Sequence, residues 1–192
     1  MYFAAITLRP DVTGPEVAGV PGSVCDNWQV LSLESHGMRV FRMEPWFLRP
    51  HGPVFFERPA ELELIHVSTP DEVAEFEAVS VRGFEQEDAT IPQGAIHPAA
   101  ILDDPNMEMF LGRVGGRAIG AAMGYRTADA VGVFGVAVVA STRRRGYGTA
   151  LTCAAMLTDS GLPCVLAPSP DGAPLYAELG FTPVGELTIW SP

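Results

Sequence analysis

The chain contains no lysine, so all twelve of its basic residues are arginines, and they face 23 acidic residues. Its formal net charge of -11 argues against nucleic acid or an anionic membrane as the main partner, because both favour basic surfaces. The charge is compatible with a cationic or neutral substrate. Cysteine is also scarce: Cys25, Cys153 and Cys164 are odd in number and lack C-x-x-C spacing, which speaks against a disulfide framework or a zinc site.

Long hydrophobic runs are lacking as well. The longest uncharged apolar stretch, residues 130–140, has about half of the roughly 20 residues that a membrane-spanning helix needs. The first residues contain too short an apolar run, with no basic segment before it, for a secretory signal. His36, His51 and His66 show no metal-ligand spacing. We therefore expect a soluble, cytoplasmic protein with no membrane partner and no metal.

Residues 1–58 are interrupted repeatedly by proline and glycine and contain only short β-like runs. They predict a β-rich N-terminal extension that packs on the sheet of a second region, residues 59–192. Turns are expected at His36-Gly37 and His51-Gly52. The predicted strands of the extension are residues 28–34, 38–43 and 53–57.

Residues 59–192 alternate between strand-like and helix-like patterns. A strand over 62–68 is followed by a helix that starts with Thr69 as N-cap and Pro70 in its first turn. The order of the segments predicts a mixed α/β sheet with helices on both faces. The later segments are a hairpin of 107–114 and 117–126, a buried strand over 130–140, a helix over 146–160, a strand over 163–168, a short helix over 172–179 and a final strand over 181–190.

The scarce positive charge is concentrated directly after the buried strand, at Arg143-Arg144-Arg145. Gly146-Tyr147-Gly148 follow and open a predicted helix, whose first backbone N–H groups have no partner within the helix. Glycine lets an anion approach the backbone, and the helix dipole and the guanidinium groups attract it. The pattern indicates a pyrophosphate site, with a solvated basic turn as the alternative. A P-loop is excluded because Gly-Lys-Ser/Thr is missing, and G-x-G-x-x-G is missing too.

Two motifs carry a resemblance to a known family. "VAVVASTRRRGYGTAL" resembles motif A of the GCN5-related N-acetyltransferases (GNAT), Q/R-x-x-G-x-G/A, through Arg143, Gly146 and Gly148. "SPDGAPLYAELGF" resembles the family's second signature, Y-x-x-L-G-F, through Tyr176 and the residues 179–181. The resemblance covers residues 61–192. It implies the GNAT fold, a mixed and mostly antiparallel central sheet flanked by helices.

The resemblance further implies that acetyl-CoA is the cosubstrate and that an acetyl group passes to a primary amine of a small molecule or peptide. The pantetheine arm would pair with one strand's backbone, the acetyl group would lie between that strand and residues 164–167, and the pyrophosphate would sit on the arginine loop. Ser169 has two interpretations, a cofactor contact or a helix cap, and the cap is favoured. The residues that the resemblance assigns to cofactor binding are Val136, Ala137, Val138, Arg143, Arg144, Arg145, Gly146, Tyr147, Gly148, Thr149, Ser169 and Tyr176.

For catalysis, the resemblance makes Tyr176 the candidate general acid, the alternative being a tyrosine that only packs. The sequence does not identify the general base, because the strand over 130–140 contains no carboxylate. Glu108 is one candidate for a base acting through water. The others are His97 and the acidic cluster Glu85, Glu87 and Asp88, each of which has an incidental surface residue as its alternative.

Two other functions remain open at this point. The missing strand carboxylate is compatible with a module that binds acyl-CoA without chemistry. The aromatic residues of the extension could instead dock a protein partner, although packing within the protein is the favoured interpretation. The acidic 83–106 region favours a cationic acceptor amine, and the oligomeric state, including a homodimer, is left open.

Overall fold

The computed structural model describes residues 4–192; residues 1–3, the start of the predicted extension, lie outside the described residues. The chain divides into two compact units. Unit 1 contains the chain up to Leu48, Ala167–Ala177 and Phe181–Pro192. Unit 2 contains Arg49–Leu166 and Glu178–Gly180. None of the helices among the described residues has the length and apolar character needed to cross a bilayer.

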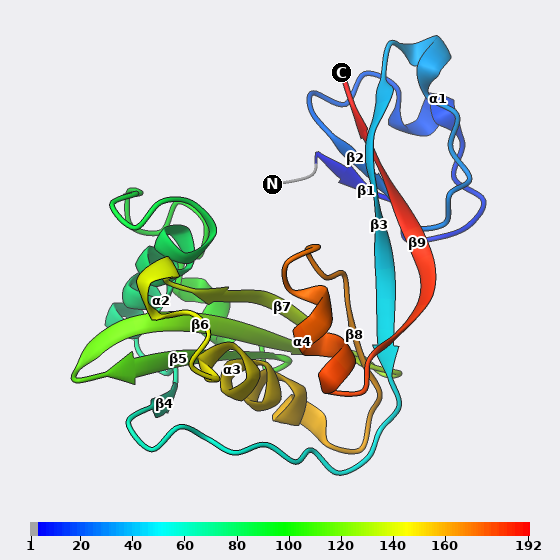
Figure 1. The fold of residues 1–192 in the computed structure, drawn as a ribbon. Coiled ribbons are helices and arrows are strands. Elements are labelled where there is room, and N and C mark those ends of the chain that lie inside the picture. Colours follow the sequence, from blue (N-terminus) through cyan, green and yellow to red (C-terminus); the bar gives the residue numbers. More distant parts are fainter. Residues whose placement is uncertain (1–3) are drawn as a thin grey trace. The chain divides into compact units, whose positions relative to one another are not determined.

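Unit 2 is built on a sheet whose strands lie in the order β8-β7-β6-β5-β4 (Figure 1). Neighbouring strands are antiparallel except β7 and β8, which are parallel. The predicted mixed and mostly antiparallel sheet is therefore confirmed. The strands are β4 (Glu63–His66), β5 (Met107–Val114), β6 (Arg117–Arg126), β7 (Val131–Val138) and β8 (Cys164–Leu166).

Helices cover both faces of this sheet, as the segment order predicted. On one face, α2 (Pro70–Phe84) buries apolar side chains against β5 and β6, and on the other α3 (Tyr147–Met156) does so (Figure 1). Burial of each large apolar side chain stabilises the fold by about 1.5–3 kcal/mol. Short 3-10 turns lie at Ala99–Asp103, Ala140–Thr142 and Leu157–Asp159. The α2 face includes Val73, Phe76, Val79, Met109, Leu111 and Ala121, and the α3 face includes Leu62, Ile119, Tyr147 and Ala150.

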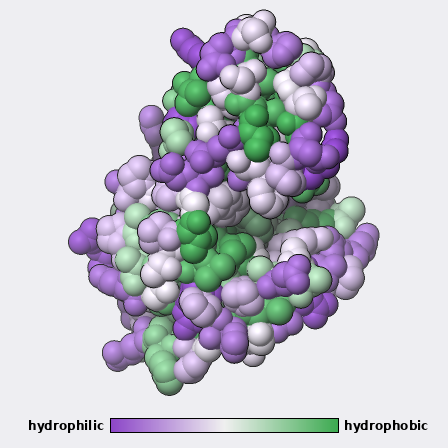
Figure 2. Space-filling view, turned by 90° about the vertical axis from the view of Figure 1, so that its right-hand side faces the viewer, coloured by the Kyte–Doolittle hydropathy of each residue, from purple (hydrophilic) through white to green (hydrophobic). Residues whose placement is uncertain are grey.

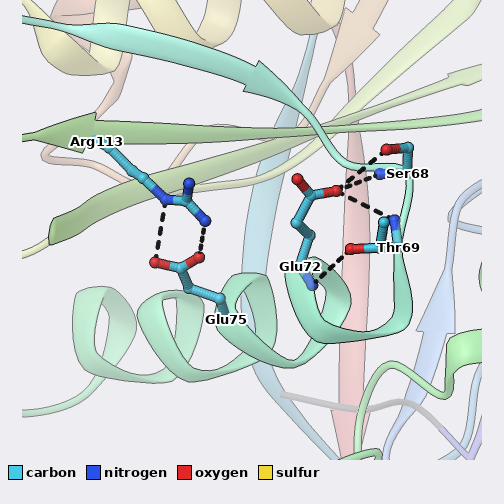
Figure 3. Close-up of polar contacts among 5 residues, drawn as sticks. All are labelled: Ser68, Thr69, Glu72, Glu75 and Arg113. Carbon is cyan, nitrogen blue, oxygen red and sulfur yellow. Dashed lines mark hydrogen bonds and ion pairs between the residues drawn. The ribbon is translucent and has the colours of Figure 1, made fainter. Parts of the chain in front are cut away.

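The start of α2 follows the sequence prediction closely. The amide of Glu72 donates to the Thr69 hydroxyl at 3.3 Å, and the Glu72 carboxylate accepts from the Thr69 amide at 3.1 Å (Figure 3). This capping box satisfies N–H groups that the helix itself leaves free. One turn further on, the Glu75 carboxylate pairs with the Arg113 guanidinium, which ties α2 to β5 (Figure 3).

The last turn of α2 comes unusually close to β7. A Cβ atom added to Gly83 would lie 2.8 Å from the Cβ of Ala137 and 3.1 Å from the amide nitrogen of Val138. Carbon atoms in contact normally lie about 3.5–4.0 Å apart, so only glycine fits there. The absence of a side chain at position 83 thus sets the spacing between helix and strand.

Unit 1 contains strands in the order β1-β2-β9-β3 (Figure 1). β1 and β2 are parallel, and β9 is antiparallel to both β2 and β3. The terminal residues of β3 and α4 belong to unit 2. The elements are β1 (Ala5–Ile6), α1 (Gly14–Val17), β2 (Val24–Asp26), a 3-10 turn (Glu34–His36), β3 (Arg39–Arg49), α4 (Ala173–Glu178) and β9 (Thr182–Ser191).

Two strands predicted in the N-terminal region are wrong, whereas the one over 38–43 is confirmed within β3. Over 28–34 the chain turns instead, because the buried Asp26 carboxylate accepts the amide of Leu31 at 2.8 Å, and Gln29 has a left-handed φ of 53°. Residues 53–57 form no strand. There the Arg49 guanidinium donates to the Pro53 carbonyl at 2.7 Å, and proline has no N–H to offer a sheet.

Several apolar side chains remain at the surface. Figure 2 shows apolar residues lying among hydrophilic ones on the face that it displays. Trp28 is 52% exposed and Phe55 is 84% exposed, so these two aromatic residues of the predicted extension are not core residues of their own units.

We predict that Gly83→Ala lowers the free energy of unfolding by about 1–2 kcal/mol, because the added Cβ atom overpacks the contact with β7. The higher helix propensity of alanine offsets only part of this destabilisation. Urea unfolding followed by circular dichroism measures this change. Gly185→Ala is the control, since a Cβ atom there meets no atom within 4 Å. An equal effect of both substitutions would show that the α2–β7 contact is not tight.

Candidate functional site

A β-bulge bends β7 near its middle. Ala121 pairs with Ala137 and Met123 pairs with Phe134, so Gly135 and Val136 together oppose the single residue Ala122. Gly135 has a φ of 59°, the left-handed conformation that glycine adopts without strain. The extra residue interrupts the regular pairing and bends the strand.

β7 separates from β8 beyond its first residues. The register between the two strands contains the pairs Val131–Cys164 and Gly132–Val165, and among the described residues it does not continue to the bulge. At the far end of β7, the amide of Val139 donates to Ile119 on β6 at 2.9 Å. Because peptide groups alternate between the two edges of a strand, those of Val138 point away from β6. A ligand can therefore reach backbone groups of β7 on the edge that β8 leaves.

The segment between β7 and α3 presents a row of backbone N–H groups. Arg144 has a φ of 64°, and Gly146, the N-cap of α3, has a φ of 78°. The α3 N-terminus has no side-chain cap. From Arg144 to Thr149, no backbone N–H donates to an acceptor in the part of the chain that the structure describes. Such a row of free N–H groups at a helix N-terminus binds phosphate groups.

The three arginines have different surroundings. The Arg143 guanidinium donates to the carbonyl of Val138 at 2.9 Å and to that of Gly83 at 2.7 Å. Arg143 therefore ties the end of β7 to the end of α2. The side chains of Arg144 and Arg145 are exposed and, among residues 4–192, form no ion pair, although Arg145 influences the pKa of both Tyr147 and Glu61. Two guanidinium groups next to free N–H groups fit a doubly charged anion such as a diphosphate.

Tyr147, the buried first residue of α3, fixes the base of this loop. Its hydroxyl donates to the Glu61 carboxylate at 2.7 Å. This hydrogen bond raises the pKa of the Tyr147 phenol and lowers the pKa of the Glu61 carboxyl. A Cβ atom on Gly146 would lie 3.4 Å from a ring carbon of Pro59, so the 59–61 segment packs against the arginine loop.

A second carboxylate lies just before the arginines. Glu87 accepts a hydrogen bond from the Ser141 hydroxyl at 3.1 Å and another from the Ser141 amide. The loop that follows α2 is thereby attached to the 3-10 turn before Arg143. Neither Glu61 nor Glu87 forms an ion pair with the arginine triplet within the described chain, although Arg145 is close enough to help lower the pKa of Glu61.

Glu108 lies away from the arginine loop. It pairs with Gly124 across β5 and β6, and a Cβ atom on Gly124 would touch Ala155 near the C-terminal end of α3. The arginine loop is at the N-terminal end of the same helix. The Glu108 carboxylate pairs with the His66 imidazole on β4. Of the other base candidates, His97 has a pKa lowered by burial, which keeps its imidazole neutral near pH 7.

Tyr176 and Ser169 belong to unit 1. Burial raises the pKa of Tyr176 to about 12, so its phenol stays protonated at neutral pH. Its ring meets Phe181 edge-on, with 6.0 Å between the ring centroids. The Ser169 hydroxyl accepts the amide of Gly172 at 3.2 Å, and the Ser169 carbonyl accepts that of Ala173 at 3.0 Å, contacts typical of a residue that caps α4.

Within residues 4–192, His, Cys, Asp and Glu form no group of three or more that could hold a metal ion. Cys25, Cys153 and Cys164 are free and buried, and burial raises the pKa of each thiol to about 11.

Several features and contacts that shape the site were missed by sequence reasoning. A glycine within a valine-rich strand signals a bulge, so Gly135 could have been identified. Gly83 could have been noticed only as a glycine inside a helix. Glu61 lies 86 residues from Tyr147 along the chain and Glu87 lies 54 residues from Ser141, so no local pattern joins them.

Comparisons with known proteins agree with this architecture. Residues 69–181 match the family model described as "Acetyltransferase (GNAT) family". A GCN5-related N-acetyltransferase structure from Kribbella flavida has a TM-score of 0.70 at 21% identity, covering 97% of this chain and 79% of that chain. One from Sphaerobacter thermophilus has a TM-score of 0.61 at 18% identity, covering 88% and 59%.

A more distant likeness is to an aminoglycoside acetyltransferase from an uncultured soil metagenomic sample, in complex with sisomicin. Its TM-score is 0.51 at 17% identity, covering 62% of this chain and 86% of that chain. At these identities the likenesses show the fold alone. A search of curated proteins finds no match to the sequence.

We predict that Arg143→Ala lowers the free energy of unfolding by about 1–2 kcal/mol, because two hydrogen bonds from a charged group are lost. Arg144→Ala should change it by less than about 0.5 kcal/mol, as expected for a surface substitution without contacts. Urea unfolding of both variants makes the comparison. Equal values would contradict the different surroundings of the two arginines.

Proposed function

The chain belongs to the GNAT acetyltransferase family, and on that basis we propose that it transfers an acetyl group from acetyl-CoA to a primary amine of a small molecule or peptide. The observation that carries the proposal is the open edge of β7, which ends at a loop with free backbone N–H groups and two exposed guanidinium groups. An extended ligand with a diphosphate fits this combination.

In this proposal the diphosphate of acetyl-CoA lies on the N–H groups from Arg144 to Thr149, with Arg144 and Arg145 supplying charge. Arg143 acts differently, because its guanidinium is already bound to the carbonyls of Val138 and Gly83. It holds the end of β7 in place. The pantetheine arm pairs with those backbone groups of residues 136–138 that point to the edge that β8 leaves, apart from the Val138 carbonyl, which already accepts the Arg143 guanidinium.

The transfer itself requires proton movements at two atoms. The amine nitrogen attacks the thioester carbonyl, the C–S bond breaks, and the departing sulfur accepts a proton. Tyr176 is the proposed donor, because its raised pKa keeps the proton available at neutral pH. A backbone N–H near the bulge would stabilise the negative charge that develops on the carbonyl oxygen.

A base must also accept a proton from the amine. Glu108 bears the single carboxylate on β5, β6 and β7, which is the support for its role as a base acting through water.

The proposed acceptor is a cationic amine. The acidic residues 85–88 follow α2, and the whole chain carries a formal net charge of -11, so an amine that is protonated in solution is attracted to the protein. The similarity in fold to an acetyltransferase crystallised with sisomicin is consistent with an acceptor of this class.

A second function has one observation in its favour. β7 contains no carboxylate, so a protein of this fold that binds acyl-CoA without transferring the acyl group fits the same site. Incubation with acetyl-CoA and a panel of amines, followed by detection of free thiol, separates the two functions. Tight CoA binding without turnover on any amine would favour the binding module.

We predict that Arg144→Ala/Arg145→Ala weakens CoA binding at least about tenfold, equivalent to about 1.4 kcal/mol, because two charges next to the diphosphate are removed. Isothermal titration calorimetry measures the affinity. Arg39→Ala/Arg117→Ala removes the same charge from other exposed positions and is the control. Unchanged affinity in the Arg144→Ala/Arg145→Ala variant would show that the diphosphate does not bind at this loop.

We predict that Tyr176→Phe slows turnover by about 100-fold or more, because the departing sulfur loses its proton donor. CoA affinity should stay within about twofold, since the ring remains. Tyr125→Phe on β6 provides the control. Turnover at the wild-type rate in the Tyr176 variant would show that another group protonates the sulfur.

A further inference from the structure

The segment that precedes β4 contacts the first turn of α3 (Figure 1). Leu62 is buried together with Tyr147, and the amide of Leu62 donates to the Pro59 carbonyl at 3.0 Å, which closes a turn over residues 59–62. A Cβ atom on Gly146, the N-cap of α3, would lie 3.4 Å from Pro59. This turn is therefore held in one place beside the start of the helix.

Glu61 belongs to this turn, and its carboxylate is held by a side chain of α3. The residue is exposed, whereas Tyr147 is buried and donates its hydroxyl to the Glu61 carboxylate at 2.7 Å. This hydrogen bond lowers the pKa of Glu61, and the charge of Arg145 lowers it further. The carboxylate is therefore charged at neutral pH, and the tyrosine keeps it beside the arginine loop.

Arg145 is thus attracted in two directions. It precedes Gly146 and is exposed, and within residues 4–192 it forms no ion pair. On one side is the Glu61 carboxylate, and on the other is the row of free backbone N–H groups at which the diphosphate is proposed to bind. Of the three arginines, Arg145 is the one whose charge contributes to the pKa shift of Glu61. Arg144 therefore offers an exposed guanidinium that is comparable but not coupled to this carboxylate.

We propose that Glu61 is a positioning residue that competes with the diphosphate of CoA for Arg145, so that it weakens cofactor binding and speeds the release of product CoA. The inference rests on the proposed function and adds a control of cofactor affinity by a carboxylate outside the arginine loop. Part of the attraction between Arg145 and Glu61 is lost when the guanidinium turns to the diphosphate, which reduces the net gain from binding. Product CoA carries the same diphosphate as acetyl-CoA, so the competition acts on both.

The coupling is tested first in the protein without ligand. Arg145→Ala should raise the pKa of Glu61, because a positive charge that favours the carboxylate is removed. Arg144→Ala is the matched control and should leave the pKa of Glu61 at its wild-type value. Titration of the side-chain carboxyl resonances by NMR measures both. Equal pKa values of Glu61 in the wild type and in Arg145→Ala would overturn the proposal.

Glu61→Gln then tests the competition itself. Glutamine keeps an oxygen that can accept the Tyr147 hydroxyl, so the substitution removes the charge and retains the acceptor. At about 0.01 M ionic strength, calorimetry should give a Kd for CoA about threefold below that of the wild type, the scale of an exposed charge pair. At about 1 M, where the Debye length is about 3 Å, the difference should disappear. Glu63→Gln is the control, because Glu63 is also exposed but pairs with Arg113 across β4 and β5, and it should keep the wild-type Kd.

The tighter binding should appear as slower dissociation. Among variants of one site, changes in affinity lie mostly in the dissociation rate. Stopped-flow displacement of bound CoA should therefore show a rate about threefold lower for Glu61→Gln than for the wild type or Glu63→Gln. A faster dissociation or a raised Kd in Glu61→Gln is expected of a carboxylate that only supports the fold, and it would overturn the proposal.

A double-mutant cycle separates competition for Arg145 from direct repulsion of CoA. In the Arg145→Ala background, Glu61→Gln should no longer change the Kd, whereas in the Arg144→Ala background the gain of about threefold should persist. An equal gain in both backgrounds would show that Glu61 repels CoA directly and would contradict the competition. If Glu61→Gln does not fold, the NMR titration still decides the question, because it requires substitutions only at the two exposed arginines.

Failure of the proposed function gives a different set of results. A wild-type protein that binds CoA but acetylates no amine would refute the transferase proposal and leave the competition standing, because the cycle measures binding alone. A wild-type protein that does not bind CoA would refute both. In that case a raised pKa of Glu61 in Arg145→Ala would show that the two charges are coupled for a reason other than CoA.

Discussion

The geometry of the candidate site depends on one constraint: β7 must stay bound to β6 on one edge while it leaves β8 on the other. The bulge at Gly135 meets this constraint, because an extra residue in β7 bends the strand without ending its pairing with β6. The bent strand then leads directly into the arginine loop and α3. The open edge of β7 thus lies next to the free N–H groups that the uncapped N-terminus of α3 supplies.

Carboxylates hold the loops around this strand. Glu61 fixes the first residue of α3, Glu87 attaches the loop after α2 to the turn before the arginines, and Glu77 holds the far end of that same loop. Each accepts hydrogen bonds from uncharged donors rather than from arginine. An acidic chain can thus keep two guanidinium groups exposed and outside ion pairs in the described residues, and still use its acids for structure. The one arginine of the triplet that is engaged, Arg143, binds carbonyl groups instead.

Much of unit 2 could be predicted from sequence because its signals are local. Thr69 and Glu72 mark the start of α2, the consecutive glycines 115 and 116 form the hairpin turn with left-handed φ angles, and the valine-rich run becomes β7. The predictions failed where a distant or buried group decides the conformation. Asp26 folds residues 28–34 into turns, which hydrophobic patterning alone could not show. The position of Arg144 in the loop was predictable from the motif, whereas the separate role of Arg143 depends on Gly83, 60 residues away.

The buried cysteines have a practical consequence for the enzymology. A thiol with a pKa of about 11 is almost entirely protonated at pH 8, and disulfide reagents react with the thiolate. Colorimetric detection of liberated CoA should therefore have a negligible background from the folded protein. Slow colour development without acetyl-CoA would in turn report opening of the interior, so the same reagent serves as a check on the integrity of each variant.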